Sequence, residues 1–184
     1  MLCLANSKIY LGFIGVSHKP PGLLQTAEYA HVLTQMGSPE ASPTWVKEGV
    51  EARMQRQHLL RAEHGPVVKV VIEEPVLRRP VGGRDILRNQ LDKLLELGRR
   101  PRVMLQVVPA DSECHFGMDG SFILYTVPTK GQIAYTETRV SSDPRDDLDS
   151  VQKYMALFGD LCSDALPAAA SRARIETIRS DLDA

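Results

Sequence analysis

The sequence predicts an α/β (or α+β) fold: a single domain with a mixed, mostly buried sheet of about four strands and helices at both ends. Two observations lead to this prediction. Short β-branched apolar runs are separated by a leucine-rich helical pattern, and amphipathic helical patterns lie towards both termini. The 184 residues, 43% of them apolar, suit one domain with a sizeable core. We therefore treat residues 1–184 as one domain in which residues 1–19 form an N-terminal extension.

The first apolar run, residues 9–16, predicts a buried strand or extended segment. It is short for a signal peptide, and no clear cleavage site follows it. No stretch approaches the ~20 apolar residues that are needed to span a bilayer. Three widely spaced cysteines, Cys3, Cys114 and Cys162, fit a reducing compartment. We therefore expect a cytoplasmic protein that does not engage a membrane.

The next segment predicts a turn followed by a short helix. Residues 20–22, Pro-Pro-Gly, interrupt regular structure, and Thr26 is typical of a helix N-cap. Apolar residues at helical spacing then continue to Gly37, which ends the helix. Leu23 and Leu24 precede the cap and lie outside the apolar stripe of this helix. We therefore expect both leucines to be buried by other parts of the chain.

A second helix is predicted over residues 45–63, with Thr44 as its cap. Arg53 and Gln57 fall in the middle of its apolar face. One interpretation is that the stem of Arg53 lies on the core and its charge pairs with a carboxylate. The alternative is that Arg53 and Gln57 line a pocket.

The centre of the chain predicts a strand, a helix and a second strand. Residues 67–72 and 103–108 are almost wholly apolar, as in strands that are covered on both faces. Leucines at helical spacing lie between them, and Gly98 ends that helix. This order favours a parallel crossover connection. Residues 75–80 predict an irregular segment that is bounded by prolines.

The pattern changes in the last third of the chain. Residues 122–127 and 132–138 predict a hairpin, which makes the sheet mixed. Ser-Asp-Pro at residues 142–144 predicts the start of a long amphipathic helix that Pro167 stops. A final helix is expected from about residue 169.

Several motifs occur in a characteristic order along the chain. They are Pro-Gly-Leu-Leu-Gln-Thr with a following Tyr-Ala (residues 21–30), Arg-Met-Gln-Arg-Gln (53–57), Glu-Pro-Val-Leu-Arg-Arg-Pro-Val-Gly-Gly (74–83), Gln-Leu (90–91), Gln-Val-Val-Pro (106–109) and Gly-Ser-Phe (120–122). Together they resemble a domain of unknown function from actinobacterial regulators, where it usually follows an Xre-type helix-turn-helix. The resemblance covers nearly the whole chain and implies a sensing or regulatory role. It brings no catalytic residue.

The charge balance and the N-terminal sequence bear on partners. Lys and Arg number 22 against 23 Asp and Glu, and no helix-turn-helix pattern precedes residue 20. We therefore expect no direct contact with nucleic acid. The resemblance implies two partners instead, a small-molecule effector and a separate helix-turn-helix regulator.

Familiar catalytic motifs are absent, among them the nucleophile elbow, the phosphate loop and the zinc-protease helix. Cys114 and His115 are the only adjacent Cys/His pair, and they lack further ligands at zinc spacing. Gly82 and Gly83 precede a helix but favour a simple turn over an anion site. We therefore expect no metal and no cofactor.

Seven polar residues are candidates for a ligand site: Arg53, Gln57, Glu73, Arg78, Gln106, His115 and Glu137. His115 follows the end of a buried strand, where α/β sheets bind ligands. Glu73 and Glu74 point to opposite faces and cannot form a dyad, so one should pair with Arg53 or Arg78. For Arg53 the expected partner is Glu73 first and Glu137 second.

Two functions follow from this pattern. The first is a non-catalytic domain that senses a small molecule or binds a protein within a family of transcriptional regulators. The alternative is a small cofactor-free enzyme of a biosynthetic pathway, of cyclase or isomerase type, which would work by orienting its substrate.

Overall fold

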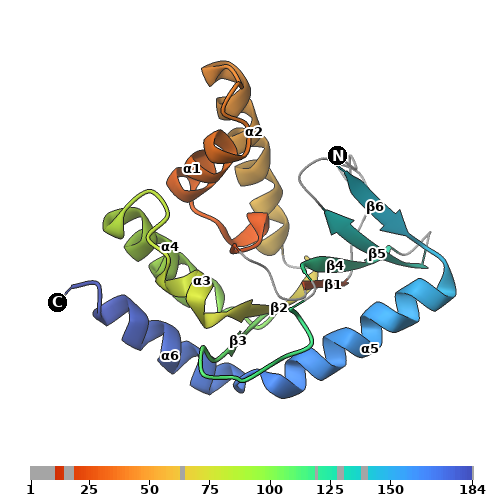
Figure 1. The fold of residues 1–184 in the computed structure, drawn as a ribbon. Helices are drawn as coiled ribbons and strands as arrows, with labels where there is room; N and C mark the ends of the chain where they lie inside the picture. The colour runs from red at the N-terminus through yellow and green to blue at the C-terminus, as the bar shows by residue number, and fades with distance from the viewer. Residues whose placement is uncertain are drawn as a thin grey trace.

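A mixed β-sheet forms the centre of the molecule (Figure 1). The computed structural model describes residues 11–14, 19–62, 65–118, 120–127, 131–137 and 141–183, without the side chains of residues 11–14 and 137. The strands are β1 (Leu11–Ile14), β2 (Val67–Glu73), β3 (Val103–Val108), β4 (Phe122–Val127), β5 (Gly131–Glu137) and β6 (Ser142–Arg145). They lie in the order β3-β2-β1-β4-β5-β6.

The sheet has a parallel half and an antiparallel half. β1 and β3 both run parallel to β2, whereas β4, β5 and β6 are joined to the sheet by antiparallel pairing. The predicted hairpin is therefore confirmed as β4 and β5. The apolar run near the N-terminus supplies β1, which lies between β2 and β4. The prediction of about four strands is too low, since the described residues form six.

Helices and two short 3-10 turns flank the sheet. They are η1 (Gly22–Leu24), α1 (Ala27–Gly37), α2 (Pro43–Arg56), η2 (Gln57–Leu60), α3 (Glu74–Arg78), α4 (Arg84–Leu97), α5 (Leu148–Asp164) and α6 (Ala168–Ser180). α1 is confirmed with its cap, because the hydroxyl of Thr26 accepts a hydrogen bond from the Tyr29 N–H at 3.2 Å. α3 replaces the irregular segment that was predicted over residues 75–80.

The predicted second helix is wrong at both ends. α2 is capped by Ser42 rather than Thr44, since the Ser42 hydroxyl accepts from the Trp45 N–H at 3.2 Å. Pro43 then occupies the first helical position, where its missing N–H costs nothing. After Arg56 the chain tightens into η2 instead of continuing as an α-helix.

The helix that was predicted from Ser142 begins at Leu148 instead. Asp147 is its cap, and a carboxylate oxygen of Asp147 accepts from the Ser150 N–H at 2.9 Å. The Ser-Asp-Pro residues belong to β6, which pairs with β5 at the outer edge of the sheet. Proline is tolerated there because an edge strand has one side without a hydrogen-bonding neighbour.

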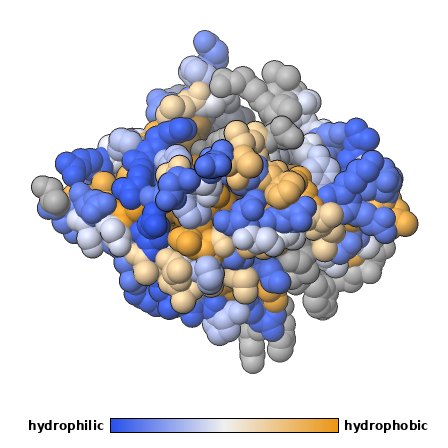
Figure 2. All heavy atoms as spheres, turned by 60° about the horizontal axis from the view of Figure 1, so that its bottom comes forward, coloured by the Kyte–Doolittle hydropathy of each residue, from blue (hydrophilic) through white to orange (hydrophobic). Residues whose placement is uncertain are grey.

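Apolar cores lie on both faces of the sheet. Val70 and Ile72 of β2 pack with the leucines of α4 and with Ile175 of α6. Val71 points to the other face, where it joins Phe158 of α5. Strand alternation places the odd and even residues of β2 in different layers. In Figure 2, which brings the lower side of Figure 1 forward, hydrophobic residues form separate patches among hydrophilic ones.

Candidate functional site

The segment before α1 is fixed by side chains from distant parts of the chain. Gln25 is 1% exposed, and its amide nitrogen donates to the Pro20 carbonyl at 2.5 Å. Arg53 Nη1 donates to Gln25 Oε1 at 2.8 Å. The amide nitrogen of Gln57 donates to the Gln25 main-chain carbonyl, also at 2.5 Å. Two of the seven predicted site residues therefore hold Gln25 in place.

Gln90 of α4 completes this arrangement, which we call the Gln25 clamp. Its Oε1 accepts from the Thr26 N–H at 2.9 Å, and its Nε2 donates to the Leu24 carbonyl at 2.8 Å. Both Gln90 and Leu24 are fully buried, whereas Leu23 is half-buried. The prediction that both leucines are buried is therefore wrong for Leu23. The sequence motif around Gln90 was visible, but nothing in the sequence marked its role.

Arg53 also explains the glycine at position 22. A Cβ atom at Gly22 would lie 3.3 Å from Arg53 Cδ, so a glycine lets the arginine stem lie against the main chain. The carboxylate that we expected first for Arg53 contacts another residue, because Glu73 Oε1 lies 3.5 Å from His115 Nε2. The side chain of Glu137, the second expected partner, lies outside the described residues.

Glu73 and His115 are the predicted site residues that the structure brings together away from the clamp. Glu73 ends β2, and His115 lies in the loop that follows β3, so both lie at the carboxyl ends of parallel strands. His115 Nδ1 accepts from the Gly117 N–H at 3.1 Å. The ring proton of the neutral histidine is then on Nε2, which faces Glu73. Both ring nitrogens of His115 therefore have neighbours within the protein.

Arg78 takes part in an ion-pair cluster around Glu74. Its Nε donates to Glu74 Oε1 at 2.9 Å, and Arg174 Nη1 donates to Glu74 Oε2 at 2.6 Å. The Ala110 N–H donates to the same oxygen at 3.3 Å. Burial raises the pKa of the Glu74 carboxyl, but the hydrogen bonds from Arg78 and Ala110 and the charge of Arg174 together lower that pKa below 4.5.

This cluster attaches α6 to the rest of the molecule. Arg78 also contacts Asp181 at 3.4 Å, just beyond the end of α6. Arg179 of α6 donates to Asp92 of α4 at 2.9 Å. The prediction that one glutamate of the adjacent pair meets Arg78 is thus confirmed for Glu74, and Glu74 is the more buried of the two.

Gln106 has a structural role at the junction of α5 and α6. Its amide nitrogen donates to the carbonyls of Cys162 and Leu166, at 3.4 and 3.1 Å. The described candidate residues therefore fall into separate places: the Gln25 clamp, the Glu73–His115 contact, the Glu74 cluster and this junction. They do not converge on one pocket.

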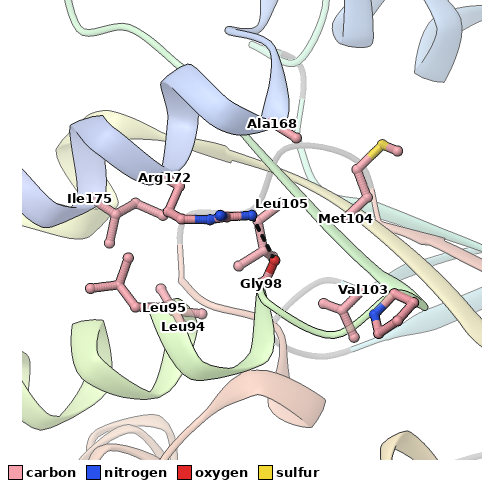
Figure 3. A pocket seen from close by; sticks show the side chains of 10 residues that line it. Leu94, Leu95, Gly98, Val103, Met104, Leu105, Ala168, Arg172 and Ile175 are labelled. Carbon is pink, nitrogen blue, oxygen red and sulfur yellow. Dashed lines mark hydrogen bonds between the residues drawn. The ribbon is translucent and has the colours of Figure 1, made fainter.

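A cavity of about 190 Å³ lies elsewhere, between the end of α4, strand β3 and the start of α6 (Figure 3). Its walls are mostly aliphatic and include Leu94, Leu95, Val103, Leu105 and Ile175. Arg172 is the charged residue among them, and its side chain crosses the cavity in Figure 3. Arg172 Nη2 donates to the Gly98 carbonyl at 3.3 Å.

The predicted site residues do not line this cavity. Its walls come from three elements that are distant in the sequence, and most of its residues belong to ordinary apolar stripes. A sequence pattern reports the face of each helix or strand but not the space left between them. Arg172 alone carried a signal, as a charge on the helix that follows Pro167.

The described residues contain neither a metal-binding cluster nor a helix that could span a membrane. No group of three or more His, Cys, Asp and Glu side chains is arranged to hold a metal ion within the described ranges. None of the helices that the structure describes is long and apolar enough to cross a membrane.

The sheet, the flanking helices and the Gln25 clamp define a mixed α/β domain whose polar motifs hold the fold together. Residues 18–177 match the family model described as a domain of unknown function (DUF5753), and the chain belongs to this family. The match includes the clamp residues and the residues that line the cavity. No curated protein and no solved structure matches the chain.

Proposed function

We propose that this domain is a non-catalytic, ligand-responsive module, and that its ligand binds in the cavity between α4, β3 and α6. The cavity itself is the observation that carries this proposal: it is apolar, it contains one arginine, and it separates three elements. A molecule bound there would contact all three elements at once. The candidate polar side chains that the structure describes are engaged in contacts within the protein, which favours binding over catalysis.

The proposal is tested with a variant that fills the cavity. Ala168 lies in its wall at the first turn of α6, so Ala168→Leu adds three carbon atoms there. A thermal-shift screen of small metabolites should find molecules that raise the melting temperature of the wild type more than that of Ala168→Leu. If every molecule that stabilises the wild type stabilises the filled variant equally, the cavity is not the ligand site.

The motifs that resemble regulator domains support an output through a helix-turn-helix protein, and we propose such a protein as the partner. The test is co-purification of the tagged domain with helix-turn-helix proteins from cells that express both. We expect the amount of helix-turn-helix protein that is recovered to differ between the wild type and the filled variant Ala168→Leu. Equal recovery with both forms would show that partner binding does not depend on the cavity.

A further inference from the structure

We infer that the cavity takes a small molecule of amino-acid type, with a carboxylate, an adjacent N–H donor and an aliphatic side chain. This inference rests on the proposed function, because it names the ligand class for the same cavity. Its first support is size. An apolar cavity of about 150 Å³ holds a benzene molecule, and this cavity of about 190 Å³ suits roughly six to nine non-hydrogen atoms.

The second support is the free edge of β3, which forms one wall of the cavity. The Arg102 carbonyl accepts from β2, whereas Val107 points both of its main-chain groups away from β2: its N–H donates to Ser171 Oγ at 3.0 Å, and its carbonyl accepts from the Leu166 N–H at 2.9 Å. Main-chain groups alternate along a strand, so those of Leu105 point to the same outer edge as those of Val107.

Leu105 therefore presents an N–H and a carbonyl at the cavity wall. The residue is 6% exposed, and no described group forms a hydrogen bond with either atom on this edge. Buried main-chain groups are nearly always paired. A donor and an acceptor from one strand residue match a ligand that carries an acceptor and a donor close together, as an amino acid or its N-acyl form does.

The third support is Arg172. A guanidinium has five N–H donors, and one of them is used on the Gly98 carbonyl. The remaining donors suit a carboxylate, which would also accept from the Leu105 N–H. Arg172 and Met104 line the cavity and are both exposed, so the cavity reaches the surface of the protein. The leucines and Ile175 then surround the aliphatic side chain.

The experiment measures the binding of four probes by calorimetry. L-leucine and L-valine carry both polar groups, 4-methylpentanoate lacks the N–H donor, and leucinamide lacks the carboxylate. We expect the first two to bind more tightly than the others. Arg172→Met should weaken their binding by about 10–100-fold, the usual worth of hydrogen bonds to a charged group. Arg99→Met removes an exposed arginine outside the cavity and should leave binding unchanged.

The outcomes separate this inference from the proposed function. Ala168→Leu should abolish binding of the two full probes while circular dichroism shows an unchanged fold. Tighter binding of 4-methylpentanoate or leucinamide, or binding that Arg172→Met does not affect, overturns the ligand class but leaves the cavity as a site. Failure of all four probes overturns the ligand class as well. The proposed function then stands or falls on the metabolite screen.

Discussion

At the scale of single residues, the motif before α1 acts through hydrogen bonds to the main chain. Gln25 and Gln90 are almost fully buried, and each uses both ends of its amide. A buried amide is stable only when its donor and acceptor are both satisfied. These glutamines therefore fix how the segment before α1 lies on α4.

The first prediction concerns Gln90. Gln90→Leu leaves the Thr26 N–H and the Leu24 carbonyl without their partner, and each buried group left unpaired costs about 1–3 kcal/mol. Urea unfolding should show this loss in the free energy of unfolding. Asn89→Ala, at an exposed position next to it, is the matched control and should change stability by less than about 0.5 kcal/mol. Equal values for both variants would show that the clamp is not a stabilising feature.

The second prediction concerns Glu74 and pH. The pKa of its carboxyl is lower in the folded protein than its ordinary value of 4.5, so its contribution to stability is present above that value and is lost as the pH falls through the folded pKa. Glu74→Gln should therefore reduce the free energy of unfolding at pH 7, by about 1.5–3 kcal/mol. The difference from the wild type should narrow as the pH is lowered below about 4.5.

Urea titrations of both forms across this pH range check the prediction. Glu51→Gln is the control, because Glu51 is exposed and its pair with Lys47 at 3.9 Å is long. Surface pairs of this kind contribute little to stability. A difference between wild type and Glu74→Gln that stays constant from neutral to acidic pH would contradict the proposed role of the Glu74 charge.

At the scale of helices and strands, two sets of cap-like residues compete to start α5. Ser142→Ala removes one of the two predicted cap residues, Ser142 and Asp143. Asp147→Ala removes the observed cap. We expect Asp147→Ala to lower the melting temperature, because the Ser150 N–H loses its acceptor. Ser142→Ala should leave the melting temperature nearly unchanged. The reverse result would place the start of the helix at residues 142–144, as the sequence predicts.

Much of the fold could be predicted because its elements are strongly patterned. β2, β3 and α4 are apolar runs and leucine stripes that have few alternative structures. β6 could not be predicted in this way, because its four residues are all exposed and it exists only through pairing with β5. Local cap-like residues gave a helix signal there, and pairing with the preceding strand β5 decided the outcome.

The candidate site was less predictable than the fold for a related reason. Arg53 and Gln57 were singled out because polar residues interrupt an apolar face, and the structure shows that they satisfy Gln25. A sequence does not distinguish a polar residue that binds the main chain from one that binds a ligand. The approach of His115 to Glu73 was favoured by the topology of parallel strands, which brings their carboxyl ends together.

At the scale of the whole molecule, many of the described arginines are paired with carboxylates. Arginines that face carboxylates include Arg78, Arg88, Arg100, Arg145, Arg174 and Arg179. With a formal net charge of −1, the protein has little excess positive charge to neutralise the phosphates of DNA. We predict that a mobility-shift titration at low salt finds no saturable preference for promoter DNA over random duplex. A clear preference would contradict this prediction.

The two outer strands of the sheet determine whether molecules can join one another edge to edge. Part of β3 is covered by Leu166 and Ser171, whereas β6 is short and carries a proline between two charged residues. Such strands resist polymerisation into larger sheets. Replacing both Asp143 and Pro144 by valine should make the protein scatter light at lower concentration, while Asp146→Val, outside the strand, should not. A result of this kind would show that the charged, proline-containing edge strand β6 opposes self-association.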